Sequence, residues 1–118
     1  MSAKVVDLRV TRALKALQAE PARRWTVKEL AKLAGASRAS LVRLFHASTG
    51  TSPKRWLTRY RLERAAELLS LGEQPLAHVA ASVGYVSEFA FSRAFKRRYG
   101  VAPAHYRQQT SLTLRCAA

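Results

Sequence analysis

The chain has 118 residues, enough for one domain or for two very small domains that share an element. Hydrophobic residues make up 48% of the sequence, a share that can bury a core and that excludes a chain disordered throughout. There are 21 Lys and Arg against 7 Asp and Glu, so the net charge at pH 7 is +14. A charge this far from zero is typical of a protein with a polyanionic partner, most often nucleic acid; a solvated basic surface is the alternative.

The cysteine content and the N-terminal segment indicate the compartment. Cys116 is the single cysteine, which excludes an internal disulfide framework or a cysteine metal cluster and favours a reducing interior. Residues 1–15 lack the apolar stretch of a signal peptide, and no apolar run reaches membrane-spanning length. We therefore expect a soluble, intracellular protein without a membrane partner.

Nearly the whole first half of the chain is predicted to be helical, because apolar residues recur at three- and four-residue steps. A first amphipathic helix, ending before Pro21, is outlined by Val6, Leu8, Val10, Leu14 and Leu17. Thr26 and Glu29 have the spacing of a capping box that opens a second helix. That helix carries Leu30, Leu33 and Ala34 and ends at Gly35. A third helix follows, from the cap at Ser37 to Gly50.

The second half is predicted to hold four more helices. The longest runs over 53–72, with Pro53 at its first position. Shorter helices are predicted over 75–83, 87–99 and 103–106. The segment beyond Gln109 has no clear period, so we expect a frayed tail there.

The sequence repeats itself at a shift of about fifty residues. At a shift of 50 the matched pairs are Ser37 and Ser87, Arg43 and Arg93, Phe45 and Phe95, Gly50 and Gly100, Pro53 and Pro103, and Trp56 and Tyr106. Upstream the shift is 49, and the pairs are Leu30 and Val79, Ala31 and Ala80, and Gly35 and Gly84. The second copy therefore has one extra residue in its turn, at Tyr85 and Val86. We interpret the two segments as a duplicated unit.

Each copy is a short helix, a glycine turn and a longer helix that begins at a serine, which is the outline of a helix-turn-helix motif. In that motif the second helix enters the major groove of DNA and the first helix braces it. An ordinary helical hairpin is the alternative. The duplication and the basic charge favour DNA binding.

The face opposite the predicted core carries an arginine at the same place in both copies. The inward positions are Leu41, Leu44 and Phe45 in the first copy and Phe91, Ala94 and Phe95 in the second. The outward positions are Arg38, Ala39, Val42, Arg43 and His46 in the first copy and Glu88, Phe89, Ser92, Arg93 and Lys96 in the second. The fork of an arginine side chain can bond O6 and N7 of guanine together, so we expect Arg43 and Arg93 to contact bases. A phosphate contact or a solvated charge is the alternative for each.

The aromatic residues near the second glycine turn have different expected roles. We expect Tyr99 to pack beside the inward rings. Phe89 shares the outward face with Arg93, where an apolar ring can meet a thymine methyl group. Burial against the preceding helix is the alternative for Phe89.

The long middle helix has a length suited to joining two DNA-binding motifs. From Pro53 to Ser70 it is predicted to be roughly 27 Å long at 1.5 Å per residue. Successive major-groove faces on one side of B-DNA lie ~34 Å apart, so one chain can place both motifs in adjacent groove segments. Any bending that the DNA must undergo costs on the order of 1–6 kcal/mol.

An enzyme is the main alternative class of protein, and few features of the sequence support it. His46, His78 and His105 lie too far apart for metal-ligand spacing, and we find no glycine-rich phosphate loop or Ser/His/Asp arrangement. We therefore expect no enzymatic activity, no metal and no cofactor. A second rival is a basic architectural protein that binds DNA without sequence preference.

The segment "VAASVGYVSEFAFSRAFKRRYGVAPAHYR" resembles the signature of the DNA-binding region of the AraC/XylS family of bacterial transcription regulators. The first copy, "LAKLAGASRASLVRLFHASTGTSPKRWLTRYRLERAAELL", fits equally well, and the resemblance covers roughly residues 8–108. It implies an all-α fold of about seven helices: one helix-turn-helix subdomain in 1–52, a linker helix in 53–72 and a second subdomain in 73–108, before the tail in 109–118. Ala102 departs from the family pattern, which has Ser or Thr before this proline.

The resemblance also implies a function and its residues. Base-reading positions fall at Ala39, Val42 and Arg43, and at Glu88, Phe89, Ser92 and Arg93, and phosphate contacts at Ser37, Ser87 and the helix from Pro103. The full set of candidate DNA-binding residues is Ser37, Arg38, Ala39, Val42, Arg43, His46, Ser87, Glu88, Phe89, Ser92, Arg93, Lys96 and Arg97. The expected protein is a sequence-specific regulator, by resemblance an activator, in the bacterial cytoplasm at the nucleoid. Its expected partners are double-stranded promoter DNA and, as a further candidate, RNA polymerase. We expect a monomer on DNA, either a stand-alone protein or part of a longer chain with an effector domain.

Overall fold

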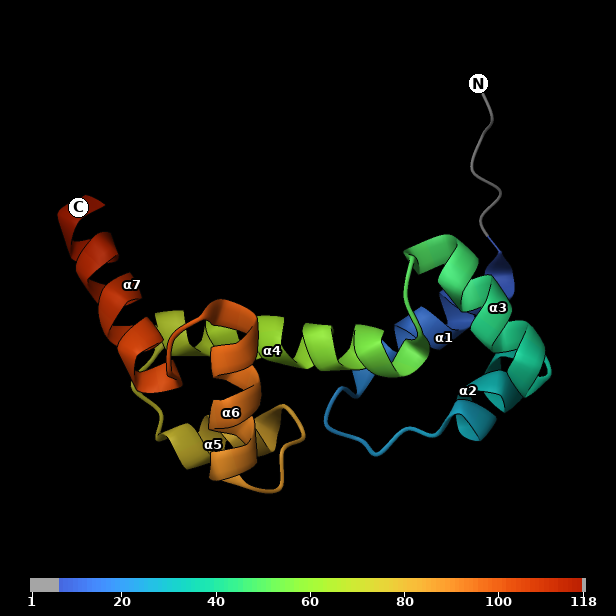
Figure 1. Ribbon diagram of the computed structural model, residues 1–118, viewed down its shortest axis with the longest axis horizontal. Coiled ribbons are helices and arrows are strands. Elements are labelled where there is room, and N and C mark those ends of the chain that lie inside the picture. The colour runs from blue at the N-terminus through green and yellow to red at the C-terminus, as the bar shows by residue number, and fades with distance from the viewer. Residues whose placement is uncertain (1–6, 118) are drawn as a thin grey trace. The chain divides into compact units, whose positions relative to one another are not determined.

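The computed structural model describes residues 7–117, with side chains within residues 7–110. Val6 and the Cys116 side chain, both considered above, lie outside what it describes. Residues 7–117 form helices and connecting segments, without a strand (Figure 1). The helices are α1 (Leu8–Ala19), α2 (Val27–Ala34), α3 (Arg38–Thr49), α4 (Pro53–Leu71), α5 (Leu76–Ser82), α6 (Glu88–Tyr99) and α7 (Pro103–Ala117). The predicted all-α fold class is confirmed.

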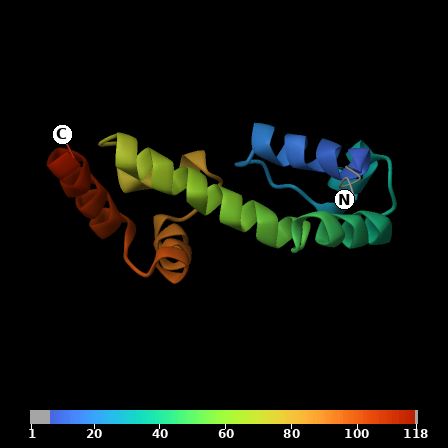
Figure 2. The ribbon, with the colours of Figure 1, turned by 90° about the horizontal axis from the view of Figure 1, so that it is seen from above.

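The chain divides into two compact units, one ending at Arg59 and the other beginning at Tyr60. The boundary falls within α4, which is a single uninterrupted helix (Figure 2). Leu57 of α4 belongs to the core of the first unit and Leu62 to the core of the second. One helix therefore supplies residues to both hydrophobic cores.

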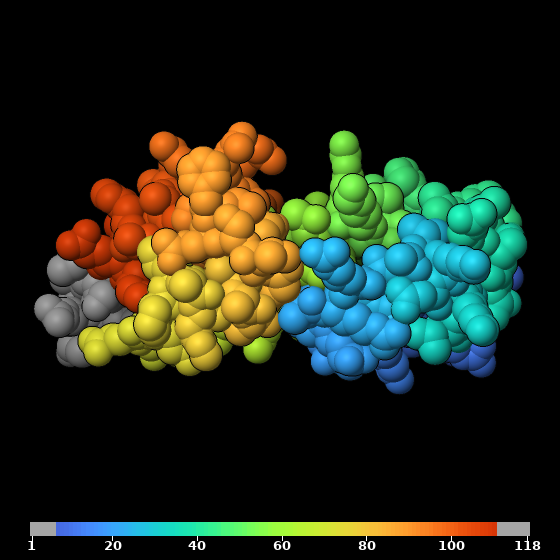
Figure 3. Space-filling view, turned by 90° about the horizontal axis from the view of Figure 1, so that it is seen from below, coloured from blue at the N-terminus to red at the C-terminus, as the bar shows by residue number. Residues whose placement is uncertain are grey.

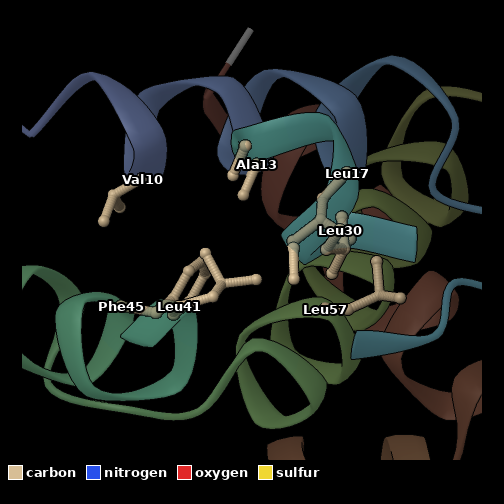
Figure 4. Packing of buried hydrophobic residues seen from close by; sticks show 9 residues of the cluster. Val10, Ala13, Leu17, Leu30, Leu41, Phe45 and Leu57 are labelled. Atoms are coloured by element: carbon tan, nitrogen blue, oxygen red, sulfur yellow. The ribbon is translucent and has the colours of Figure 1, made fainter. Parts of the chain in front are cut away.

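The core of the first unit lies between α1, α2, α3 and the beginning of α4. Figure 4 shows Val10 and Ala13 of α1 directed towards Leu41 and Phe45 of α3. Ala13, Leu41 and Phe45 are completely buried. The spacing of the buried α1 residues explains the packing, because positions three and four apart share one helix face.

Local signals determine where the first helices begin and end. The side chain of Asp7 caps α1 by accepting a hydrogen bond from the Arg9 backbone N–H at 2.9 Å. The predicted capping box of α2 is confirmed: Thr26 Oγ1 accepts from the Glu29 N–H, and Glu29 Oε1 accepts from the Thr26 N–H, both at 3.1 Å. The Trp25 indole donates to the Glu20 carbonyl at 2.8 Å, which closes the connection between α1 and α2.

Two of the leucines named in the helix predictions are exposed, Leu8 in α1 and Leu33 in α2. The buried face of α2 is built from Leu30, Ala31 and Ala34. At about 100° per residue, Leu33 lies roughly 100° from the centre of that face. Leu8 lies on the side of α1 opposite its buried residues for the same reason.

The core of the second unit has the same plan. Val79, Ala80 and Val83 come from the α5 region and Phe91 and Phe95 from α6. The second half of α4 takes the place that α1 has in the first unit, and its core residues are Leu62, Ala65, Ala66 and Leu69. Tyr99 packs against this core, with its ring centre 4.6 Å from that of Phe95, as predicted.

Helix α7 differs from its prediction in length. It continues to Ala117, beyond the expected end near Tyr106 and through the segment expected to be a frayed tail. No proline or glycine follows Pro103, so nothing in the sequence terminates the helix. Arg107 ties α7 to the segment before α5, because its Nη2 donates to the Gln74 carbonyl at 2.5 Å.

Candidate nucleic-acid interface

Helices α3 and α6 begin and end in the same way. Ser37 Oγ accepts a hydrogen bond from the Ser40 N–H at 3.1 Å, and Ser87 Oγ accepts from the Ala90 N–H at 3.2 Å. Each helix has 12 residues and ends at a glycine of φ +81°. Identical caps at both ends explain why the two copies present equivalent surfaces.

The turn before each of these helices is built on a glycine in the left-handed region, Gly35 at φ +77° and Gly84 at φ +98°. A Cβ atom makes that conformation costly, so glycine is the residue that turns the chain here. The following N–H reaches back to the preceding helix in both copies: Ala36 to the Ala31 carbonyl at 3.0 Å and Tyr85 to the Ala80 carbonyl at 2.9 Å. The cap at Ser87 comes one residue later than its counterpart, which confirms the extra residue in the second turn.

The structure places the inner and outer faces of α3 and α6 as predicted. Leu41, Phe45, Phe91 and Phe95 are completely buried. The exposed candidate residues are Ser37, Arg38, Ala39, Val42, Arg43 and His46 at α3, and Ser87, Glu88, Phe89, Arg93, Lys96 and Arg97 at α6. Ser92 is the exception, since it is only partly exposed. Each helix therefore presents one continuous outer stripe that contains its repeated arginine.

Phe89 belongs to the outer stripe of α6. Its side chain is 71% exposed, so the alternative of burial against the preceding helix is wrong. The guanidinium carbon of Arg93 lies 5.6 Å from the centre of the Phe89 ring, within the range of a cation–π contact. Figure 3 shows the α6 region, in orange, on the exposed surface of its unit.

The positive charges around α6 divide into two groups. Arg98 forms an ion pair with Glu63 of α4 at 3.3 Å and lies over the Tyr99 ring, so it belongs to the packing of the unit. Arg93, Lys96 and Arg97 are exposed, and no ion pair involves them within the described residues. These three cations are therefore available to a polyanion.

Sequence reasoning did not assign a role to the pair formed by Arg61 and Tyr85. Arg61 of α4 is partly buried near Tyr85, and this burial lowers the pKa of its guanidinium. Burial raises the pKa of the Tyr85 hydroxyl, while the charges of Arg61 and Arg97 act to lower it. The Tyr85 ring lies 5.6 Å from that of Phe91. The extra residue at Tyr85 and Val86 was the signal in the sequence that the second turn differs from the first.

The exposed stripes of α3 and α6 carry groups that suit recognition of DNA. Within the described residues there is no group of three His, Cys, Asp or Glu side chains that could hold a metal ion. No helix in that part of the chain combines the length and the apolar composition that crossing a membrane requires. Arginine donors, hydroxyl groups and an exposed ring on one stripe are the groups that contact phosphates, guanine and thymine methyl groups.

Comparison with known proteins agrees with this geometry. Residues 30–109 match a family described as a helix-turn-helix domain. The chain is 46% identical over 92% of its length to a protein of Streptomyces lividans that is named as AraC-like. It is 44% identical over 75% of its length to the HTH-type transcriptional activator RclR of Escherichia coli K12. The chain spans about a third of the length of these relatives, 36% and 31%.

Solved structures of similar proteins share the fold over most of the chain. The C-terminal domain of AraT, a response regulator of Geobacillus stearothermophilus, superposes with a TM-score of 0.83 at 33% identity, over 91% of this chain and 88% of that one. The DNA-binding domain of AdpA, a global transcriptional factor solved in complex with a target DNA, superposes with a TM-score of 0.79 at 31% identity, over 88% and 93%. The relatives are named as transcription regulators and the AdpA domain as a DNA-binding domain, so the comparisons point to regulators and not to enzymes.

Proposed function

The chain belongs to the AraC family of helix-turn-helix transcription regulators, and from that premise we propose that it reads specific promoter sequences through two recognition helices, α3 and α6. The single observation that carries this proposal is the repeated outer stripe. Arg43 and Arg93 occupy the same place on two equally capped helices, and both are exposed. The complex of the AdpA domain with a target DNA supports double-stranded DNA as the ligand.

The proposed contacts follow the positions on each stripe. When a recognition helix lies in the major groove, some side chains of its exposed stripe contact base edges and others fix its position on the phosphates. The proposed base-reading residues are Ala39, Val42, Arg43, Glu88, Phe89, Ser92 and Arg93. The proposed phosphate-contacting residues are Ser37, Arg38, His46, Ser87, Lys96 and Arg97.

The two units are proposed to bind adjacent major-groove segments of one DNA molecule. Helix α4 runs from Pro53 to Leu71, and the boundary between the units falls inside it, so both units belong to one continuous chain segment. Each unit supplies one recognition helix, which is what each subunit of a dimeric regulator supplies. A monomer of this chain therefore has the elements that are needed for a bipartite site.

The proposed biological role is transcription activation in the bacterial cytoplasm, at the nucleoid. The relative RclR is named as an activator, and the relatives named above come from bacteria. An activator works on the transcription machinery, so RNA polymerase is the proposed protein partner. Because this chain spans about a third of its relatives, an effector domain elsewhere in a longer protein is part of the same proposal.

The rival function is a basic architectural protein, which the charge of +14 alone would support. Competition between a selected duplex and a scrambled duplex at ~0.2 M salt separates the two. A regulator should retain a preference of roughly 1,000-fold or more for the selected duplex at that salt concentration. Equal and steeply falling affinity for both duplexes would support the architectural function instead.

A further inference from the structure

Phe89 and Arg93 lie one helical turn apart on the exposed stripe of α6. The ring of Phe89 is 71% exposed, although burying a phenylalanine side chain is favourable by about 1.5–3 kcal/mol. The guanidinium of Arg93 lies over this ring at 5.6 Å, and both side chains remain accessible. An aromatic ring held in water beside an exposed cation is suited to contact with a ligand that has both an apolar group and hydrogen-bond acceptors.

The first unit contains an internal comparison for this pair. In the repeat frame Arg43 corresponds to Arg93 and Ala39 corresponds to Phe89. Both arginines are exposed on helices with the same caps, but only Arg93 has a ring four residues before it. The Phe89 ring therefore restricts the positions of the Arg93 guanidinium, whereas the Arg43 guanidinium has no such ring four residues before it.

We infer that Phe89 and Arg93 act as one reading element for two adjacent base pairs, T·A and G·C. The ring of Phe89 covers the methyl group of thymine, the apolar group of the major groove. The guanidinium of Arg93 donates to O6 and N7 of the neighbouring guanine. The two bases must be neighbours because the two side chains are in contact.

This inference rests on the proposed function, since it requires α6 to lie in a major groove. Phe89 has two roles in it, as a contact to thymine and as a positioning residue for Arg93. A ring beneath the guanidinium reduces the rotamer freedom that Arg93 would otherwise lose on binding. Arg43 has no such support, so guanine recognition by α3 should not depend on a neighbouring thymine.

The test uses the full chain and a duplex chosen from a random pool. Replacing each thymine in turn by deoxyuridine removes only its methyl group. In the half-site lost by Arg93→Ala, one such replacement next to a guanine should weaken wild-type binding about fourfold, the equivalent of one buried methyl group. The same replacement should leave the affinity of Phe89→Ala unchanged.

Three further variants separate the two roles of Phe89. Phe89→Tyr keeps the ring and should retain both the deoxyuridine effect and the preference for guanine. Phe89→Leu keeps apolar contact without the cation–π platform, so it should retain the deoxyuridine effect but discriminate less against 7-deazaguanine at the adjacent position. Leu71→Ala removes an exposed apolar side chain from α4, outside the proposed contacts, and is the control, with an unchanged deoxyuridine effect in the half-site of α6. Because Phe89 is exposed, all its variants should unfold at the wild-type temperature.

The outcomes distinguish this inference from the function on which it rests. If the random pool yields no preferred duplex, the proposed function fails and the inference fails with it. If a preferred duplex is found but no deoxyuridine replacement beside the guanine weakens binding, the inference is overturned and the proposed function stands. Full deoxyuridine sensitivity in Phe89→Ala would overturn it in the same way.

Discussion

The rings of Phe95 and Tyr106 meet nearly edge-on, with centres 5.2 Å apart and planes inclined at 76°. Fifty residues earlier, Phe45 and Trp56 meet in the same way at 6.3 Å and 84°. One pair joins α6 to α7 and the other joins α3 to α4. The duplication seen in the sequence therefore extends to the packing of the aromatic residues, and such pairs contribute about 0.5–1.5 kcal/mol beyond the area that they bury.

Truncation of the two buried phenylalanines should destabilise their units to different degrees. Phe45→Ala and Phe95→Ala each remove a completely buried ring, at a cost of about 3–5 kcal/mol in the free energy of unfolding. Phe95 also contacts the rings of Phe91, Tyr99 and Tyr106, so we expect the larger loss there. Urea unfolding measures the free energies, and amide hydrogen exchange assigns each loss to a unit. A larger loss in Phe45→Ala would contradict this account of the cores.

Removal of either repeated arginine should weaken binding at its own half-site. Arg43→Ala and Arg93→Ala should each cost ~1–3 kcal/mol on a selected duplex and relax base preference at one position. Titration of both variants against duplexes with single base changes measures these effects. Loss of preference at the same half-site in both variants would exclude the two-groove arrangement. Equal losses on random DNA would show that the arginines contact only phosphate.

A serine at position 102 should stabilise α7. Ser52 Oγ caps α4 by accepting from the Arg55 N–H at 3.2 Å, whereas Ala102 before α7 has no side-chain acceptor. Ala102→Ser should therefore raise the free energy of unfolding by about 1 kcal/mol, and the matched Ser52→Ala change should lower it by a similar amount. Thermal unfolding of both variants measures the change in stability. An Ala102→Ser protein that is no more stable than the wild type would show that a serine cap does not form there.

The capping carboxylate of Glu29 should make stability depend on acid pH. Its hydrogen bond from the Thr26 N–H, and then its contact with Arg23, hold the pKa of Glu29 below its usual value. The folded chain thus favours the ionised form, so this stabilisation is complete at neutral pH and is lost as the pH falls below the usual glutamate pKa of about 4.3. Between pH 7 and pH 3, the free energy of unfolding should fall less steeply for Glu29→Gln than for the wild type. Parallel curves would show that the Glu29 charge has no part in the cap.

Local signals in the sequence were sufficient for most of the fold. Thr26, Ser37 and Ser87 predicted helix starts, and Gly35 and Gly84 predicted turns, because caps and left-handed turns depend on one or two residues each. The end of α7 was missed, since no local residue marks it. The exposure of Leu33 was missed because it lies at the edge of its helix face, where a three-residue step alone does not decide burial.

The candidate interface was predictable as a surface but not in its side-chain contacts. Periodicity and the repeat placed Arg43 and Arg93 outward, since both depend on the helix period alone. The stacking of Arg93 on Phe89 depends on side-chain rotamers, which sequence spacing permits but does not determine. The burial of Arg61 near Tyr85 depends on the packing of α4 against the second turn. The base and phosphate contacts themselves stay predictions.

The central claim is that both recognition helices read one DNA molecule, and footprinting on a duplex selected from a random pool tests it most directly. The account predicts a preferred sequence with two protected segments on one face of the duplex, centred about 10 base pairs apart, or one helical turn. A single short protected segment, or uniform protection without any preferred sequence, would contradict it.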